Sequence, residues 1–441
     1  MMKNIENLKS QKLLDIGSAF IIISFGLSLS GCSQKEILQG AREDIITSTT
    51  TAVEHDKTPV LLAKNGFLNK DVPQAFLNAA HCYPALKFAA SGAEVWSSNL
   101  DFESGKTLKM IASPVVAAGK IFCLDAAGVV YAIDQKNGQR IWRTSTLVEG
   151  KDGQIGGAIA YENGRVIVTS SFFECFSLDA KDGKILWRIK LPAPCKGEGI
   201  TVHEGKAFLM CANSSLQVID IETGKIIWSH SGTIVDSIYL GSAGVAVDDG
   251  LVFLAYPSGE IFALLEETGA VIWDSMFSKF SLTNSAHSFV YPRACPVVKD
   301  EAVYFVASNE QTVAFQKKTG DRLWISNFGG LQTPIVNGNS IFIFNSKSEL
   351  VCLNKDNGKL RWISKLEHDL DEISNWYSQI LIDKHILMIS PTGKISLVSP
   401  YTGKIEKSLS FSCESGISVN PVIANGVMYV LMNNAELVAY K

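Results

Sequence analysis

Acidic residues recur at one fixed place in this 441-residue sequence, directly before a polar turn that contains glycine. Asp134, Asp179 and Asp220 occupy that place in successive segments of the chain. Carboxylates of this kind could bind a calcium ion or act as a catalytic base. An aspartate before a turn can instead accept backbone hydrogen bonds that stabilise the turn, and the regular spacing favours this structural role.

The sequence shows no other pattern of catalytic or metal-binding residues. Its seven histidines are scattered without HExxH spacing, and it has no GxSxG, Walker or dinucleotide-binding fingerprint. The formal net charge of −4 provides no basic footprint, so nucleic acid is not an expected partner. The residues therefore predict no catalytic site, no metal site and no cofactor.

Cys32 lies at the end of a predicted targeting signal in which basic residues precede an apolar run at 16–29 and then Ser30 and Gly31. This order is typical of a secretory signal, and the run is shorter than the roughly 20 apolar residues of a membrane span. The ending Leu-Ser-Gly-Cys resembles a bacterial lipobox, in which cleavage leaves the cysteine carrying acyl chains that anchor a protein to a membrane. An ordinary signal peptide or an uncleaved anchor is the alternative.

The residue after Cys32 indicates to which of the two bacterial membranes the lipid would attach the protein. Ser33 stands where an aspartate would favour the inner membrane under the sorting rule known for enteric lipoproteins. We therefore expect a signal peptide at 1–31, lipid on Cys32, and a location at the periplasmic face of the outer membrane. Residues 32–72 are rich in Ser, Thr, Lys, Glu and Asp without a sustained period, which predicts a flexible tether.

Eight cysteines follow Cys32, and none forms a CxxC or adjacent pair. Several lie in strand-like stretches such as KIFCLD, where a small apolar side chain is readily buried. This placement favours buried thiols. In an oxidising periplasm some disulfide pairing remains an open alternative.

One short pattern organises the chain, and its first full copy is AIDQKNGQRIW at 132–142. Two alternating apolar runs flank a polar turn whose glycine can take positive φ, which predicts a β-hairpin. The turn glycines follow one another at 45, 41, 45, 51, 38 and 45 residues, and such periods in an all-β pattern indicate four-stranded propeller blades. These glycines are Gly138, Gly183, Gly224, Gly269, Gly320, Gly358 and Gly403.

Tryptophans stand at a fixed distance after these turns. The regular position predicts that each packs its large apolar surface between its own blade and the neighbouring blade. The seventh copy has Lys407 in this place, which predicts a weaker joint there. The predicted blade-packing residues are Trp96, Trp142, Trp187, Trp228, Trp273, Trp324 and Trp362.

The two ends of the repeat array complement each other. Eight inner units occur but only seven hairpins, because a solitary outer strand around Trp96 precedes the first unit and the last unit ends near Tyr440. We expect the two ends to complete one blade, since closure removes free sheet edges. The predicted fold is all-β, an eight-bladed β-propeller at 73–441 made of four-stranded antiparallel blades and closed by the N- and C-terminal strands.

Two connections between blades, at 229–241 and 274–293, are longer than the others. Long loops on one face of a rigid scaffold are candidates for a partner site, and tolerated insertions are the alternative.

The turn-and-tryptophan repeats resemble those of quinoprotein dehydrogenases and their non-enzymatic relatives. Together with the lipobox and the single ring, they resemble the scaffold lipoproteins of the outer-membrane β-barrel assembly (BAM) complex. This resemblance implies a non-catalytic subunit that docks onto the POTRA domains of BamA, contacts other BAM subunits and aids the delivery of unfolded outer-membrane proteins.

The resemblance also implies a docking segment after the third hairpin, where this sequence has Ile238, Tyr239, Leu240 and Gly241. Leu240 stands where the family has an arginine. The acidic pair of a second family element falls near Arg293, which is basic. Docking at the same face is expected, but through different charges, and a compensated swap is one interpretation.

An enzyme of the quinoprotein class is the main alternative. Catalysis in that class requires calcium, oxygen ligands and a quinone in the central funnel. Its members are longer and carry an adjacent-cysteine disulfide, which this sequence lacks. A surface propeller that binds peptides is a third possibility.

Overall fold

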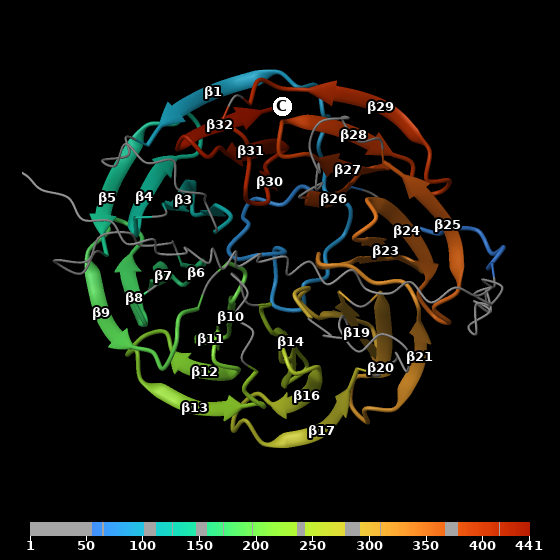
Figure 1. Cartoon of the computed structure of the whole chain (residues 1–441). Helices are drawn as coiled ribbons and strands as arrows, with labels where there is room; N and C mark the ends of the chain where they lie inside the picture. Colours follow the sequence, from blue (N-terminus) through green and yellow to red (C-terminus); the bar gives the residue numbers. More distant parts are fainter. Residues whose placement is uncertain are drawn as a thin grey trace, which may run out of the picture. The chain divides into compact units, whose positions relative to one another are not determined.

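The computed structural model describes residues 55–63, 66–100, 112–125, 127–146, 157–170, 172–195, 197–235, 243–277, 292–308, 310–366, 378–413 and 415–441. These residues form 32 strands in eight four-stranded sheets. Figure 1 shows the sheets arranged as blades around a central axis. The predicted eight-bladed β-propeller is confirmed. No helix within the described ranges has the length and hydropathy needed to cross a membrane.

Each blade is an antiparallel meander, and we number the blades by the order of their first strand after residue 112. Blades 1 to 4 consist of β2 (Val115–Ala117), β3 (Lys120–Leu124), β4 (Val129–Asp134) and β5 (Arg140–Ser145); β6 (Ile159–Glu162), β7 (Arg165–Ser170), β8 (Glu174–Asp179) and β9 (Ile185–Lys190); β10 (Ile200–His203), β11 (Lys206–Cys211), β12 (Ser215–Asp220) and β13 (Ile226–Ser231); and β14 (Ala246–Asp248), β15 (Leu251–Ala255), β16 (Glu260–Leu265) and β17 (Val271–Met276).

The remaining blades continue around the ring. Blades 5 to 8 consist of β18 (Val297–Lys299), β19 (Ala302–Ala307), β20 (Gln311–Gln316) and β21 (Arg322–Ser326); β22 (Ile335–Asn337), β23 (Ser340–Phe344), β24 (Glu349–Asn354) and β25 (Leu360–Lys365); β26 (Ser378–Ile382), β27 (His385–Ile389), β28 (Lys394–Val398) and β29 (Ile405–Ser410); and β30 (Val422–Ala424), β31 (Val427–Leu431), β32 (Glu436–Tyr440) and β1 (Glu94–Asn99).

Blade 8 closes the ring by combining strands from the two ends of the repeat array. The N-terminal strand β1 pairs with β32 in antiparallel register, from Glu94 opposite Tyr440 to Asn99 opposite Glu436. This pairing confirms the expected closure and covers a sheet edge that would otherwise be free.

The hydrophobic core is divided among the joints between blades. Eight clusters of buried residues occur, and each combines side chains of two neighbouring blades. At one joint, Phe122 and Val130 of blade 1 pack with Val168 and Phe176 of blade 2. Burying one such side chain contributes about 1.5 to 3 kcal/mol, so each blade depends on both of its neighbours.

The tryptophans of the repeat series lie at these joints. Each indole covers the turn glycine of the next blade, and a methyl group built on that glycine would lie 2.4 to 2.8 Å from a ring carbon. These glycines have φ between 69° and 77°, a conformation that glycine adopts without steric cost. The pairs are Trp96 with Gly138, Trp142 with Gly183, Trp187 with Gly224, Trp228 with Gly269, Trp273 with Gly320, Trp324 with Gly358 and Trp362 with Gly403.

The joint between blades 7 and 8 is built differently. Lys407 lies opposite Leu397 in the tryptophan position of β29, and it is exposed. On blade 8 the turn glycine has a counterpart in Gly92, because the hydrogen bond from Lys441 N–H to Ala93 O (2.8 Å) repeats the bond from Asp134 N–H to Gln139 O (2.8 Å) in blade 1. Gly92 shares the positive φ, at 77°.

Among the residues that the structure describes, no aromatic side chain covers Gly92. It is exposed, and a methyl group built on it meets no atom within 4 Å. The substitution Lys407→Trp is therefore expected to raise the free energy of unfolding by about 1 kcal/mol, because an indole could cover this glycine. Chemical denaturation measures the change. The control Lys404→Trp places the same side chain on the exposed turn of the same blade, and equal gains in both variants would contradict the assigned packing.

The segment before β1 differs from the expectation. Residues 55–72 were predicted to belong to the flexible tether, yet Asp56 N–H donates to Leu360 O (2.7 Å) and Val72 N–H donates to Val116 O (2.6 Å). Val60 and Val72 are buried. Contact with the propeller therefore begins well before Pro73, and the tether prediction is wrong for this part of the chain. No sequence pattern indicated these contacts, because the segment has no strand period of its own.

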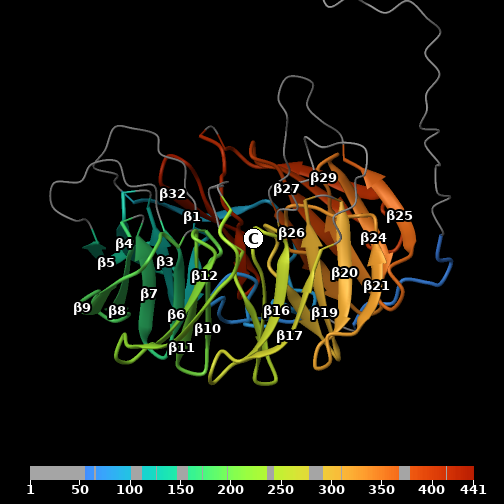
Figure 2. The same cartoon turned by 60° about the horizontal axis from the view of Figure 1, so that its bottom comes forward.

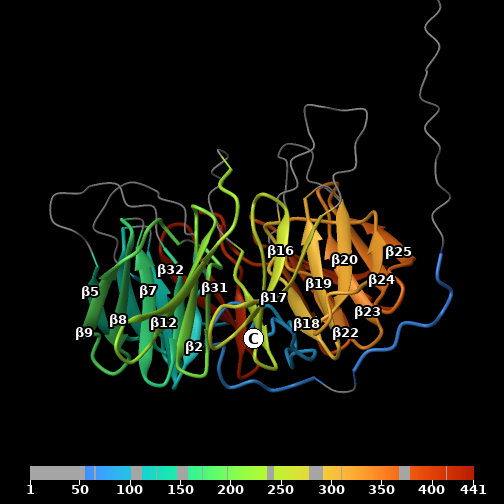
Figure 3. The same ribbon diagram turned by 90° about the horizontal axis from the view of Figure 1, so that it is seen from below.

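Residues 66–90, which we term the axial segment, make one circuit of the ring. Figure 1 shows this part of the chain, in blue, inside the ring, and Figures 2 and 3 show it toward the end where the glycine turns lie. Its residues bond in order to the innermost strands of blade 8, then blades 1 to 7. The contacts are Asn69 with Ile423, Val72 with Val116, Pro73 with Tyr161, Gln74 with Val202, Ala79 with Val247, Ala80 with Val298, Cys82 with Val336 and Leu86 with Leu381.

Candidate functional site

A polar cluster lies where three separated blades converge. Glu198, just before β10 of blade 3, accepts a hydrogen bond from Asn420 Nδ2 of blade 8 (2.8 Å). Its other oxygen lies 3.8 Å from Sγ of Cys295, just before β18 of blade 5. Blades 3, 5 and 8 are not neighbours in the ring, so side chains from all three can meet only near the axis.

Backbone and hydroxyl groups surround this cluster. The Cys295 sulfur lies 3.0 Å from Gly244 N of blade 4, and Cys295 N–H donates to Thr333 Oγ1 of blade 6 (2.9 Å). Gln379 of blade 7 donates to the carbonyl of Thr333 (2.7 Å). The innermost ends of blades 3 to 8 are therefore connected by polar contacts around Glu198.

The surroundings of Glu198 raise the pKa of its carboxyl group. Burial raises the pKa of Glu198 to about 7, although the charge of Arg293 and the hydrogen bonds from Cys295 and Asn420 act in the opposite direction. Burial and the nearby carboxylate raise the pKa of the Cys295 thiol well above its usual value. A thiol of this kind is a poor nucleophile at neutral pH.

The raised pKa of Glu198 predicts a pH-dependent stability. Because the folded-state pKa lies above the unfolded value of 4.5, stability contributed by the neutral carboxyl is present at low pH and is lost as pH rises toward 7. The variant Glu198→Gln is expected to match the wild type at pH 5 and to exceed it by about 2 kcal/mol at pH 8, a value reduced because the residue is partly accessible. Denaturant unfolding at both pH values measures the difference, and a difference that does not change with pH would contradict this assignment.

The axial segment supplies the second set of groups near the axis. His81 is buried, and its Nδ1 lies 2.8 Å from the carbonyl oxygen of Pro296. Burial lowers the pKa of His81 to about 4, so the imidazole is neutral at physiological pH. Gln74 is also buried and bonds to both the N–H and the C=O of Val202. These side chains hold the segment to the blades.

The axial residues do not fit a calcium and quinone site. Calcium takes six to eight oxygen ligands, and several of them are usually carboxylates. In the cluster described above, Glu198 is the one carboxylate, and its oxygens face Asn420 and Cys295. The donor set of this cluster is therefore too small for calcium and the quinone.

Of the predicted docking residues, the structure describes Arg293 alone. Arg293 is exposed, and its positive charge lies near Glu198. Ile238, Tyr239, Leu240 and Gly241 lie outside the described residues, as does Cys32 with the signal and most of the tether.

The repeated aspartates act in turns, as the sequence indicated. Asp134 Oδ1 accepts a hydrogen bond from Lys136 N–H (2.9 Å), and Asp179 Oδ1 accepts one from Lys181 N–H (2.7 Å). Asp220 does the same for Thr223. The eight cysteines of the described part are free, and six of them are buried, in agreement with buried thiols.

Sequence reasoning missed Glu198, Cys295 and Asn420. Each lies singly in a connection before an innermost strand, and Glu198 and Asn420 are 222 residues apart. One sequence signal could have found these residues: a connection precedes the innermost strand of every blade.

Comparison with known proteins identifies the family. A family model described as outer membrane protein assembly factor BamB matches residues 86–152 and 126–364, which together make up well over half of the chain. The chain belongs to this family of BamB-like propellers.

Individual relatives match shorter stretches. An uncharacterized protein of Rickettsia prowazekii is 30% identical over 122 residues, covering 28% of this chain and 29% of the relative. BamB of Yersinia pestis is 23% identical over 152 residues, covering 33% and 38%. A quinoprotein ethanol dehydrogenase of Pseudomonas aeruginosa is 34% identical over 95 residues, covering 20% and 15%. In each case the match spans well under half of the relative.

Solved structures share the fold over most of the ring. BamB from Moraxella catarrhalis superposes with a TM-score of 0.66 at 17% identity, covering 79% of this chain and 99% of that chain. A quinohemoprotein alcohol dehydrogenase from Comamonas testosteroni gives 0.61 at 15% identity, covering 82% and 76%. At such low identities the likeness shows the propeller fold that BamB-like proteins and quinoproteins have in common.

Proposed function

We propose that this protein is a non-catalytic scaffold of an outer-membrane β-barrel assembly machinery. In this proposal it is anchored by lipid on Cys32 at the periplasmic face of the outer membrane and docks onto the POTRA domains of BamA. The observation that carries the proposal is the match of the family model for the assembly factor BamB to most of the ring.

The way the chain uses its recurrent residues supports a scaffold. The aspartates hold turns, and the tryptophans cover turn glycines between blades. Near the axis, the axial segment contacts every blade and Glu198 contacts Asn420. These residues stabilise the ring, which leaves its faces and loops for partners.

Co-purification with BamA from solubilised membranes tests the docking. Changing Ile238, Tyr239 and Leu240 to aspartate is expected to reduce recovered BamA at least about tenfold, because charged groups cannot be buried at an apolar contact without a large cost. The control changes Ile226 and Ile227 of β13 to aspartate; both are exposed on the outer strand, at 53% and 44%.

The docking proposal requires that the loop variant recovers less BamA than the β13 control variant. Equal recovery of BamA with wild type and the loop variant would overturn it, provided that both variants unfold at the same temperature as the wild type. Arg293→Glu, which reverses an exposed charge, is expected to reduce recovery at low salt more than at high salt.

A quinone-dependent dehydrogenase is the second candidate, because a quinoprotein ethanol dehydrogenase is among the relatives. Protein incubated with pyrroloquinoline quinone and calcium is expected to show no oxidation of alcohols or sugars with a dye acceptor. Turnover that depends on added quinone would instead favour the enzyme.

A further inference from the structure

At the ends of the blades that carry the glycine turns, charged side chains join neighbouring blades. Arg165 of blade 2 pairs with Glu222 of blade 3. Lys317 of blade 5 pairs with Asp248 of blade 4 (2.8 Å), and Lys355 of blade 6 pairs with Asp300 of blade 5 (2.7 Å). At each of these joints a cation of one blade pairs with a carboxylate of its neighbour.

The joint between blades 3 and 4 has a surplus of carboxylates. Lys206 Nζ lies 3.2 Å from Glu266 Oε1 and 2.8 Å from Glu267 Oε1. Glu204 lies on the same turn as Lys206, and Glu162 of blade 2 accepts a hydrogen bond from the N–H of Gly205 on that turn (3.1 Å). Two carboxylates thus contact one lysine, and Glu204 and Glu162 lie at the same turn, which leaves negative charge for a further cation to balance.

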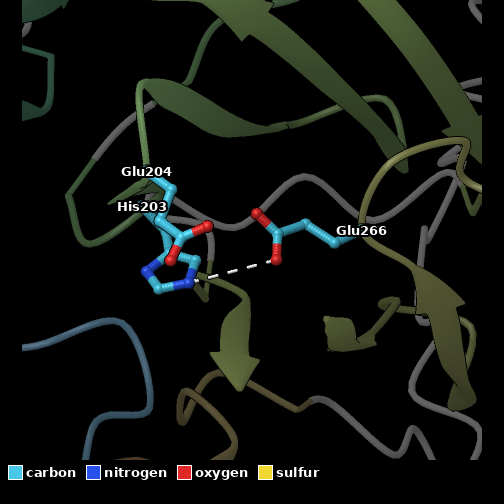
Figure 4. Close-up of side chains that lie close together, drawn as sticks. All are labelled: His203, Glu204 and Glu266. Carbon is cyan, nitrogen blue, oxygen red and sulfur yellow. Dashed lines mark ion pairs between the residues drawn. The ribbon is translucent and has the colours of Figure 1, made fainter. Parts of the chain in front are cut away.

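An imidazole completes the group. His203 Nε2 lies 4.0 Å from Glu266 Oε2, and the donor atoms of His203, Glu204 and Glu266 all lie within 4.8 Å of one another. Figure 4 shows these side chains directed toward one another. We propose that His203, Glu204 and Glu266 bind a zinc ion that links blade 3 to blade 4.

The backbone places the ligands on two rigid elements. His203 ends β10, and Glu204 with Gly205 forms the tight turn to β11, both at positive φ (46° and 79°). Glu266 follows β16, and its carbonyl accepts a hydrogen bond from the indole of Trp228 in blade 3 (2.8 Å). The joint between the two blades therefore fixes the distance between the ligands.

The chemistry of the donors selects the metal. Imidazole with carboxylates suits zinc and its neighbours, whereas calcium and magnesium prefer oxygen ligands alone. Tetrahedral zinc with bonds of about 2.0 to 2.2 Å requires donors about 3.4 Å apart. The separation of 4.0 Å between His203 Nε2 and Glu266 Oε2 is somewhat longer. Glu204 is exposed and the side chain of His203 is 32% exposed, so both can move inward.

Lys206 acts as an orienting neighbour of the site. It holds Oε1 of the buried Glu266, which leaves Oε2 facing the imidazole. Hydrogen bonds of this kind to a ligating carboxylate commonly fix its orientation. Three protein ligands leave the fourth zinc position to water.

Isothermal titration of the purified protein with Zn²⁺, in a buffer that does not bind metals, tests the proposal. One ion is expected to bind per chain and to raise the unfolding temperature, because a ligand of the folded state stabilises it. His203→Ala and Glu204→Gln are each expected to weaken binding at least about tenfold.

Two matched controls separate the site from general surface binding. Glu267→Gln removes a carboxylate that contacts the same lysine but is not part of the ligand set, and it is expected to bind zinc like the wild type. His385→Ala removes a histidine that pairs with Glu406 in blade 7, and it too is expected to leave binding unchanged.

Unfolding curves without metal establish that the His203 and Glu204 variants are folded. Unchanged affinity in both of these variants, or no saturable binding by the wild type, would overturn the zinc site. Equal weakening by Glu267→Gln would also overturn it, because the ligand set would then be wrong.

Discussion

The variant Gly358→Ala is expected to lower the free energy of unfolding by about 3 kcal/mol. Two costs add: an alanine at φ of 69° is strained by about 1 kcal/mol, and overpacking costs about 2 kcal/mol more. The overpacking arises because the added methyl group would lie 2.4 Å from Cε3 of Trp324. Urea unfolding followed by circular dichroism measures the loss.

Gly92→Ala is the matched control for this prediction. Gly92 has φ of 77°, but a methyl group built on it meets nothing within 4 Å. Only the backbone strain remains, so we expect a loss of about 1 kcal/mol. If both variants were destabilised equally, backbone strain alone would explain the glycines, and the assigned packing of Trp324 on Gly358 would be wrong.

The variant Gln74→Leu is expected to destabilise the protein by about 3 kcal/mol. Leucine has a similar size but leaves the N–H and C=O of Val202 without their present partners at 2.7 and 3.1 Å. An unsatisfied buried polar group costs about 1 to 3 kcal/mol. Because Gln74 ties the axial segment to blade 3, trypsin is also expected to cleave faster after the exposed Lys70 and Lys87.

Asn78→Leu serves as the control within the same segment. The side chain of Asn78 bonds to the backbone C=O and N–H of Cys82, and both residues belong to the axial segment. Asn78→Leu is expected to lower the free energy of unfolding by less than Gln74→Leu does. It is also expected to leave the rate of cleavage after Lys70 and Lys87 close to that of the wild type. If Gln74→Leu caused no faster cleavage than Asn78→Leu, the hydrogen bonds to Val202 would not hold the segment in place.

Much of the ring could be predicted because its determinants are local and repeated. A glycine turn between two alternating apolar runs specifies a hairpin, and equal spacing of Gly138, Gly183 and the later copies specifies the blades. The unmatched strand around Trp96 specified closure, and β1 does pair with β32. Likewise, the aspartates before the turns accept the backbone hydrogen bonds that their position indicated.

The axial segment could not be predicted in the same way. A strand in a sheet keeps the same neighbouring strands along its whole length, which imposes an alternating pattern on its residues. The axial segment instead bonds to a different blade every few residues, as Val72 does to blade 1 and Ala79 to blade 4. Such single contacts impose no period, so the segment resembled a tether.

The chemically distinctive groups are the least visible in the sequence. Glu198 and Asn420 meet although 222 residues separate them, and His203 meets Glu266 from another blade. Neither pair forms a motif, because neighbouring positions on a closed ring need not be neighbours in the chain.

By itself the sequence determined the hairpin, the number of blades, the closure of the ring and the positions of the tryptophans, since each depends on local turn chemistry repeated at a fixed period. Only the tertiary structure decided what meets at the axis and at the joints: the circuit of the axial segment, the raised pKa of Glu198 and the carboxylate surplus around Lys206. These depend on closing the ring, which brings side chains from distant blades within hydrogen-bonding distance and excludes enough water to shift their pKa values.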